Sequence, residues 1–260
     1  MSVAVHARPG WRQSNASRTG FRVLGVVGEL FITLGVLILG FLVWQLWWTD
    51  VVADKAQARI VEQLPWVSDA LRVPTGQAPS ATPDVLIATP RHDDPPVEPE
   101  VPHATTFATM TVPRWDATLT RPISEGTDRD SVLDVLGIGH YPGTAMPGAV
   151  GNFAVAGHRT TFGKPFNRIE ELRVGDPVVI QTAQAWYVYR VTSAEVVSPA
   201  DVGVIAPVPG AQGETPTQRL ITMTTCHPML SARQRFVVHG ELDYWAPVDA
   251  GVPAELLGTA

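Results

Sequence analysis

The only cysteine in the sequence, Cys226, follows an apolar run and precedes a turn that contains Pro228. A single cysteine cannot form an intramolecular disulfide or a zinc cluster built on several cysteines. The thiol is therefore either a buried, inert side chain or a nucleophile placed at the end of a strand. Its position alone leaves both interpretations open.

Two further side chains have the chemistry that a cysteine nucleophile requires. His158 ends the apolar run that starts at Asn152, and an imidazole there would favour the thiolate and later protonate a leaving amine. Arg235 opens the apolar run that follows Cys226. If these two runs are antiparallel neighbours, the guanidinium lies beside the thiol and can donate hydrogen bonds to a carbonyl oxygen as it gains charge. Taken singly, His158 is also consistent with a turn histidine and Arg235 with a surface charge.

Other residues compete for these roles: His140, His227 and His239 for the base, and Arg233 for the cation. Along an extended chain, the side chain of His227 points away from that of Cys226. His239 falls in the middle of a predicted strand, and His140 neighbours Tyr141 and is a candidate pocket residue. Arg233 shares a strand face with Arg235, so spacing does not separate them.

The elements that must position these residues are mostly short strands. From about Phe107 onwards, runs rich in Val, Ile, Tyr and Thr alternate with Gly and Pro, and two short helices are predicted, over Asp130–Leu136 and Phe166–Leu172. This pattern predicts a mainly all-β domain, a closed or nearly closed barrel, over residues 107–250. Residues 251–260 are predicted to be a C-terminal tail. The predicted strands are Phe107–Val112, Asn152–Ala156, Pro177–Thr182, Trp186–Val197, Arg219–Thr225 and Arg235–Trp245.

An uncharged apolar run from Leu30 to Trp48 precedes this domain. At about 1.5 Å per residue it reaches about 28 Å, which is close to the thickness of a bilayer core. Arginines precede the run and acidic residues follow it, which predicts a basic cytoplasmic tail (1–22), a transmembrane helix (23–48) and an extracellular remainder. A cleaved signal peptide is the alternative, but the run is longer than a typical signal core and no small-x-small cleavage site follows it.

Residues 49–106 are predicted to be a juxtamembrane segment, helical over 52–64, followed by a stalk. The stalk is rich in proline from Val67 to Ala104 and has no steady apolar period, which is typical of an extended spacer. The net charge of −6 and the scattered basic residues argue against nucleic-acid binding. No zinc or calcium motif occurs, so neither a metal nor a cofactor is expected.

Three strings in a fixed order make the sequence similar to a known family. Ala156-Gly-His158-Arg159, then Thr224-Thr225-Cys226-x-Pro228, then Arg235 before an apolar strand resemble the sortases. The stretches 137–143 and 151–159 resemble the class E branch of actinobacteria. The resemblance covers about residues 107–250.

This resemblance implies an eight-stranded β-barrel and a cysteine transpeptidase without a cofactor. Such an enzyme cleaves a Leu-Ala/Pro-x-Thr-Gly sorting signal of secreted proteins between Thr and Gly through a thioester. It then transfers the protein to an amine of the cell-wall precursor or to a pilin lysine. The family's pilus-building members often carry a lid with an Asp-Pro-aromatic triplet, which is absent upstream of the predicted barrel and favours general surface anchoring.

The resemblance also implies roles for individual residues. Cys226 would be the nucleophile, His158 the acid and base, and Arg235 the oxyanion or substrate clamp. Thr225 would help to position Arg235 and the substrate. Tyr141 matches the tyrosine linked to a preference for Ala in the signal, and a packed loop aromatic is the alternative interpretation. His140 would line the same pocket.

Two other classes of protein compete with this interpretation. Another cysteine enzyme of the cell wall, such as an L,D-transpeptidase or a papain-like peptidase, would carry a Ser-His-Gly-Cys string or a cysteine that precedes its histidine. The string is absent, and here the candidate histidine, His158, precedes Cys226, which follows a predicted strand rather than lying on a helix. A non-catalytic, membrane-tethered β-domain that binds wall polymer or a partner would not need the thiol, so substitution of Cys226 distinguishes it.

Overall fold

The computed structural model describes residues 15–67 and 86–257. The chain divides into two compact units, residues 1–47 and 48–260, which we describe separately. Most of the predicted tail 1–22, part of the predicted stalk (68–85) and the last residues of the predicted C-terminal tail lie outside the described residues.

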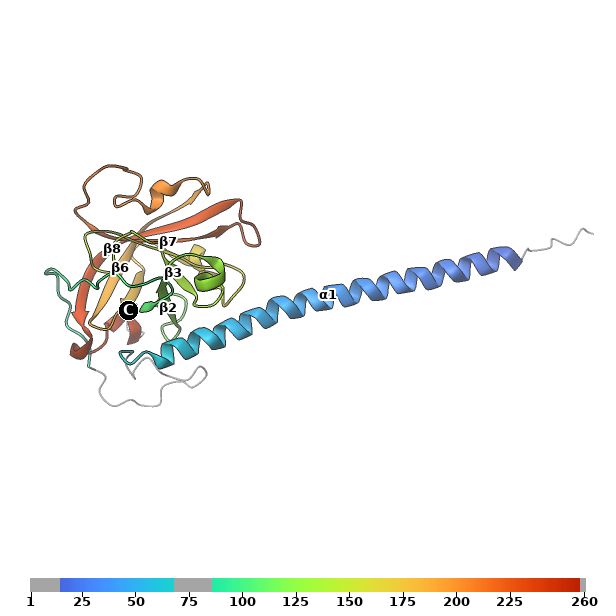
Figure 1. Ribbon diagram of the computed structural model, residues 1–260, viewed down its shortest axis with the longest axis horizontal. Coiled ribbons are helices and arrows are strands. Elements are labelled where there is room, and N and C mark those ends of the chain that lie inside the picture. The colour runs from blue at the N-terminus through green and yellow to red at the C-terminus, as the bar shows by residue number, and fades with distance from the viewer. Residues whose placement is uncertain (1–14, 68–85, 258–260) are drawn as a thin grey trace, which may run out of the picture. The chain divides into compact units, whose positions relative to one another are not determined.

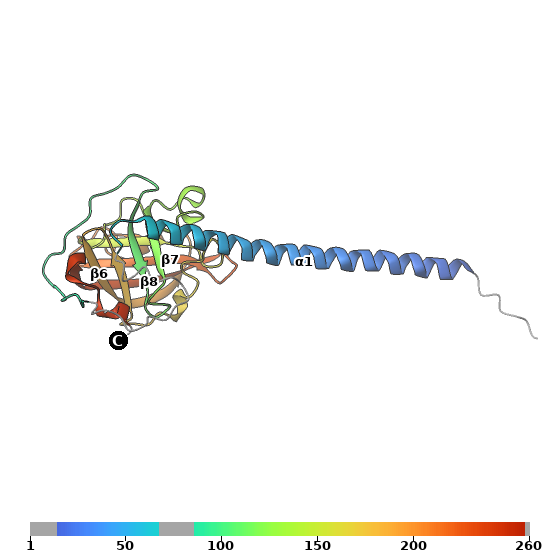
Figure 2. The same cartoon turned by 90° about the horizontal axis from the view of Figure 1, so that it is seen from below.

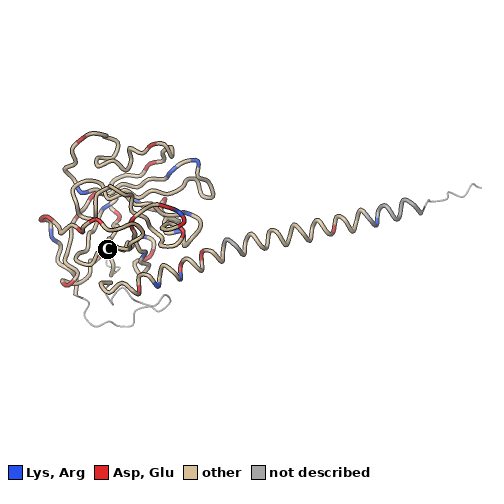
Figure 3. Tube along the Cα trace, viewed as in Figure 1, with Lys and Arg blue, Asp and Glu red and all other residues tan. Residues whose placement is uncertain are grey.

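The first unit contains most of a single long helix, α1 (Asn15–Gln63) (Figure 1). Within it, Leu24–Gln63 is long and apolar enough to cross a membrane, with a mean hydropathy of 2.5 over its most apolar window. Its apolar side chains are exposed, for example Phe31 at 70% and Leu39 at 63%. Between residues 24 and 49 the only charged residue is Glu29, and the other charged residues of this stretch lie in its C-terminal part (Figure 3). The predicted transmembrane helix is therefore confirmed as a candidate by length and composition.

α1 does not stop where the apolar run ends. The prediction separated a membrane helix from a juxtamembrane helix, but the structure joins them, because residues 50–63 contain no Gly or Pro and are rich in helix formers. The helix ends at Gln63, just before Leu64 and Pro65, and a residue that precedes proline is disfavoured in the helical region. The last turns of α1 belong to the second unit.

The second unit is built on a closed barrel in the strand order β1-β2-β3-β4-β7-β8-β6-β5 (Figures 1 and 2). This confirms the predicted eight-stranded barrel. The strands are β1 (Thr106–Thr111), β2 (Thr120–Glu125), β3 (Ile138–His140), β4 (Gly151–Ala156), β5 (Pro177–Gln181), β6 (Ala185–Val197), β7 (Arg219–His227) and β8 (Gln234–Pro247). The short helices are η2 (Arg129–Leu133), η3 (Ile169–Glu171), η4 (Val202–Ile205), η5 (Val248–Ala250) and η6 (Ala254–Leu257).

Side-chain alternation separates the barrel interior from its outer face. On β7, the side chains of Ile221 and Met223 are fully buried in the core. Successive side chains of a strand point to opposite faces, so those of Thr224 and Cys226 face outwards. On β8, Val238 points inwards, which places Arg235 on the outer face with Cys226.

The strand pairing brings three chain segments together at one rim. β4 and β7 are parallel, with Ala156 opposite Thr224, so the residues that follow both strands emerge at the same end. β7 and β8 are antiparallel, and Cys226 lies directly opposite Arg235. The predicted antiparallel arrangement of these two strands is therefore confirmed.

Part of the predicted spacer is folded. The described residues 86–104 run along the barrel, and their contacts replace the extended, solvated chain that the proline content predicted. Arg91 lies over the ring of Trp245, 4.4 Å from its centroid. The hydrogen bonds are from Ala88 N to Val252 O (2.9 Å), between the backbones of Arg91 and Trp245, from Trp245 Nε1 to Asp93 O (3.0 Å) and from Tyr187 Oη to Pro96 O (2.7 Å).

Candidate active site

A cavity of about 570 Å³ opens at the rim where β4, β7 and β8 meet. Four of the residues singled out from the sequence line it together: Tyr141, His158, Cys226 and Arg235, with Thr225 beside them. These residues come from four separate stretches of the chain, so the cavity exists only once the barrel has closed. No group of three or more His, Cys, Asp and Glu suited to a metal occurs among the described residues.

Cys226 is the penultimate residue of β7 and carries a free, partly exposed thiol. The barrel interior is filled by its neighbours Ile221 and Met223, so the thiol faces the cavity rather than the core. This placement favours the reactive interpretation of the cysteine over the buried one.

His158 lies two residues beyond the end of β4, with 15% of its side chain exposed. Its Nε2 lies 2.6 Å from Oδ1 of Asp134, whose side chain is 17% exposed. Asp134 is the residue that ends η2. No pattern in the sequence pointed to this carboxylate, because only the fold brings the end of η2 to the loop after β4.

Arg235 is half-buried, and its Nη1 donates to the backbone oxygens of Ala232 and Gln234, both at 3.0 Å. These bonds hold the guanidinium against the β7–β8 turn beside the thiol. Arg233, its competitor, is exposed and does not line the cavity.

The remaining predicted binding residues have different surroundings. The hydroxyl of Tyr141 lies 2.9 Å from Oγ1 of Thr224, which faces the cavity with Cys226. Thr225 is 3% exposed, and its hydroxyl donates to the backbone oxygen of Gly157 at 2.7 Å. This bond ties β7 to the residue just before His158.

The structure places His140 outside the cavity. It is 2% exposed, its Nδ1 lies 2.6 Å from Oε2 of Glu125, and its ring stacks on Phe153 in the barrel core. Adjacency to Tyr141 suggested a pocket residue, but neighbouring residues on a strand point to opposite faces.

Arg159, which follows His158, forms a second network that the sequence analysis did not assign. Its side chain is 2% exposed and its Nη2 lies 2.6 Å from Oε2 of Glu170. Its Nη1 lies 2.9 Å from Nδ1 of His227 and donates to the backbone oxygen of Cys226 at 3.4 Å. The hydrogen bond and charge of Arg159 hold the pKa of Glu170 below its usual range. His227 is therefore bound to Arg159 and Glu170, away from the thiol.

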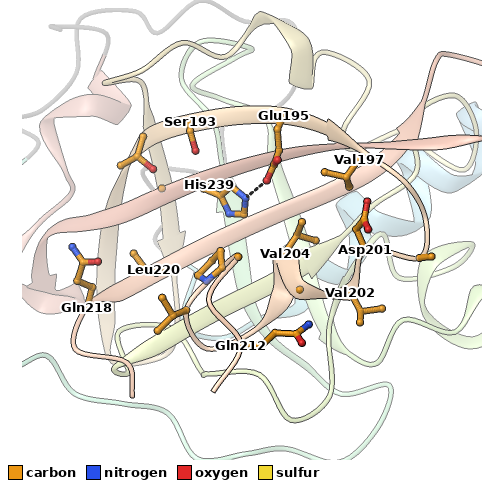
Figure 4. A pocket seen from close by; sticks show the side chains of 17 residues that line it. Ser193, Glu195, Val197, Asp201, Val202, Val204, Gln212, Gln218, Leu220 and His239 are labelled. Atoms are coloured by element: carbon orange, nitrogen blue, oxygen red, sulfur yellow. Dashed lines mark hydrogen bonds and ion pairs between the residues drawn. The ribbon is translucent and has the colours of Figure 1, made fainter. Parts of the chain in front are cut away.

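A larger hollow, of about 690 Å³, lies on the outer face of β6, β7 and β8 (Figure 4). The loop that connects β6 to β7 and contains η4 forms one side of it. His239 lines it, with Nε2 3.2 Å from Oε1 of Glu195 and Nδ1 2.9 Å from the hydroxyl of Thr222. None of the three candidate catalytic residues lines this hollow. His239 is thus a residue of the strand face, as its position predicted.

The fold and the site together define a closed β-barrel with a cysteine, a histidine and an arginine gathered at one rim. Residues 110–243 match the family description "Sortase domain", which spans more than half of the chain. The chain belongs to the sortase family.

Two curated relatives from Streptomyces coelicolor are similar over most of the chain. Sortase SrtE1 is 37% identical over 256 residues, covering 95% of this chain and 65% of that relative. The chain thus spans just under two thirds of the length of SrtE1. Sortase SrtE2 is 29% identical, covering 89% of this chain and 87% of the relative.

Solved structures agree with this assignment. SrtA sortase from Actinomyces oris is 43% identical, with a TM-score of 0.62. The match covers 65% of this chain and 97% of the Actinomyces oris chain. Sortase E1 from Streptomyces coelicolor with a tripeptide in the active site is 39% identical, with a TM-score of 0.54. The match covers 59% of this chain and 97% of the Sortase E1 chain. The predicted resemblance to class E sortases is confirmed by these relatives.

Proposed function

We propose that the protein is a membrane-anchored cysteine transpeptidase that cleaves a sorting signal of secreted proteins between Thr and Gly. The observation that carries this proposal is the pairing of Cys226 opposite Arg235, with His158 lining the same cavity. Membership of the sortase family supports it.

The reaction would begin with attack of the Cys226 thiolate on the carbonyl carbon of the signal threonine. Arg235 would donate hydrogen bonds to the oxygen as it becomes negative. Protonated His158 would then give its proton to the glycine nitrogen, so that the Thr–Gly bond breaks and a thioester remains on Cys226.

The second half of the reaction reverses these roles. Neutral His158 would take a proton from an incoming primary amine while the amine nitrogen attacks the thioester carbon. The C–S bond would break, an amide would form and the thiolate would return. Water in place of the amine would give hydrolysis.

Asp134 would act on His158 in both halves. A carboxylate at 2.6 Å accepts the proton on Nε2, which selects one tautomer and stabilises the imidazolium. Because Asp134 occupies Nε2, proton exchange with the thiol and substrate would use Nδ1.

The substrates would be secreted proteins with a C-terminal Leu-Ala/Pro-x-Thr-Gly signal, and the acceptor an amine of the cell-wall precursor or a pilin lysine. Tyr141 would lie beside the second signal residue, and its bond to Thr224 would hold the ring there. The arginines before the apolar stretch of α1 favour a cytoplasmic N-terminus and an extracellular barrel.

The test uses the full chain in detergent micelles with a fluorogenic Leu-Ala-x-Thr-Gly peptide, with and without added amine. Mass spectrometry should show a thioester on Cys226, cleavage between Thr and Gly, and an amide product when amine is present. Cys226→Ala should lose all three. If neither this peptide nor its Pro counterpart forms an adduct, the tethered binding domain becomes the better interpretation.

A further inference from the structure

Gln57, near the end of α1, has a buried polar side chain. It is 1% exposed. Its Nε2 donates to the backbone oxygen of Phe162 at 3.1 Å, and its Oε1 accepts from Nη1 of Arg121 at 2.9 Å. Both side-chain groups are therefore used, and both partners lie in the same compact unit as Gln57.

The side chain of Gln57 fits between two glycines. A Cβ added at Gly137 would lie 2.9 Å from Cδ of Gln57, and one added at Gly163 would lie 3.0 Å from its amide atoms. A side chain at either position would push the Gln57 amide aside, and both glycines also have positive φ angles, 105° and 77°, that other residues rarely adopt. The Gln57 side chain therefore packs closely between Gly137 and Gly163 of the barrel unit.

The loop that Gln57 holds has an unfavourable backbone. Phe162, Gly163 and Lys164 are consecutive, and their φ angles are 54°, 77° and 35°. Residues other than glycine rarely adopt this left-handed region, and such a conformation persists only where surrounding contacts impose it. α1 supplies those contacts on both sides of Gly163, through Gln57 to Phe162 and through Asp50 Oδ2 to Lys164 Nζ at 2.8 Å.

This loop also carries the candidate catalytic histidine. The ring of Phe162 lies 5.2 Å from the imidazole of His158, centroid to centroid. The backbone N–H of Phe166 donates to the oxygen of His158 at 3.1 Å. Thr160 and Thr161, between His158 and Phe162, line the active-site cavity. A shift of the loop would therefore move the imidazole.

We propose that residues 50–57 of α1 are a positioning element for His158, with Gln57 as the positioning residue. The proposal rests on the function proposed above. Residues 50–57 then support the loop that carries His158 without lining the cavity, and a barrel cut free at residue 105 would keep Cys226 but hold His158 less well.

The first test compares Gln57→Ala and Gln57→Glu with Gln63→Ala, a control at an exposed position of the same helix. The full chain in detergent is assayed with the signal peptide. Gln57→Glu keeps the size of the side chain and its bond to Arg121 but removes the donor to Phe162. We expect both Gln57 variants to lower kcat by about tenfold to a hundredfold with little change in KM, because a displaced base slows the chemical step. Gln63→Ala should match the wild type.

The second test does not depend on peptide turnover. Hydrogen exchange of the amides in residues 158–166 and the pH dependence of Cys226 alkylation by iodoacetamide are measured for the same variants. We expect faster exchange in this loop and a shifted alkylation profile for both Gln57 variants. Loss of thermal stability with unchanged kcat, loop exchange and alkylation profile would overturn the proposal. Failure of the proposed function would look different, since wild-type protein would then turn over no peptide while the exchange comparison still reports on the loop.

Discussion

The carboxylate of Asp134 lies 2.6 Å from Nε2 of His158, although the two residues belong to separate elements. Asp134 ends η2 and His158 follows β4, and no strand joins them. Asp134 therefore holds the imidazole of His158 through Nε2, which leaves Nδ1 for the thiol and the substrate. A base oriented by a third group is the usual arrangement around an activated nucleophile.

Replacement of Asp134 by Asn should expose the role of this pair. The amide can donate to Nε2 and so favours the wrong tautomer of His158, and we expect kcat to fall by about a hundredfold or more. The matched control is Asp130→Asn, on the exposed side of η2. Measurement of kcat/KM against pH should show an altered profile for Asp134→Asn alone. An unchanged rate and profile would remove Asp134 from the mechanism.

Substitution of Arg235 and of Arg233 should have different effects on turnover. Only Arg235 lines the cavity, and loss of a donor to a developing oxyanion typically lowers kcat by about 10²- to 10³-fold. We expect this loss for Arg235→Ala and near wild-type turnover for Arg233→Ala. Single-turnover formation of the thioester is the measurement, since it isolates the first chemical step. The opposite ranking would reassign the clamp to Arg233.

Tyr141 should influence the choice between Ala and Pro in the signal. We expect Tyr141→Leu to reduce the ratio of kcat/KM for the Ala peptide over the Pro peptide by about tenfold, a typical effect of one reshaped pocket contact. Thr224→Val tests whether the hydroxyl bond holds the ring, because it removes the partner of Tyr141 and keeps a similar volume. If both variants retain the wild-type ratio, Tyr141 is a packing residue of the loop.

The Arg159–Glu170 pair predicts a pH dependence of stability. The pKa of Glu170 is lowered in the folded protein by its hydrogen bond to Arg159 and by that charge. A lowered carboxyl pKa stabilises the fold above the ordinary Glu value of about 4.3 and loses that contribution as pH falls through the folded value. Glu170→Gln should therefore flatten the loss of thermal stability between about pH 5 and pH 3.

At neutral pH the effect of Glu170→Gln should be small, at most about 1 kcal/mol, because the carboxylate is 44% exposed and screened by solvent. Thermal unfolding at a series of pH values measures both effects. Parallel curves for wild type and variant would show that the pair contributes nothing to acid stability.

The packed segment 86–104 should add to the stability of the barrel. Tyr187→Phe removes the donor to Pro96 O, and we expect a loss of about 1 kcal/mol together with faster proteolysis within the segment. Tyr189→Phe is the control. Its hydroxyl is also buried but accepts from Gly148, so its loss should destabilise the barrel without exposing the segment selectively. Equal proteolysis of the two variants would contradict a specific role for the Pro96 contact.

Much of the fold was predictable because it depends on local patterns. The apolar run before Cys226 and the turn with Pro228 after it placed the cysteine at a strand end, and the long uncharged run identified the apolar part of α1. The order of His158, Cys226 and Arg235 suggested the site, and the barrel brings those three together.

The missed features depend on tertiary contacts between distant segments. Asp134 meets His158 only because η2 folds back over the β4 loop, and Gln57 meets Phe162 across a sequence separation of 105 residues. The proline-rich composition of 86–104 correctly excluded helix and internal sheet. It carried no information on the barrel surface that binds this segment through Arg91 and Trp245.

The strand order of the barrel also determines at which point in folding the active site is complete. Cys226 precedes Arg235 in the chain, and β7 lies between β4 and β8 in the closed sheet. β8 in turn must pair with β6 along almost its whole length, and long-range pairings of this kind form late in folding. A chain folded only as far as β7 would have Cys226 without Arg235 opposite it, so the pairing of β8 is the step that completes the site.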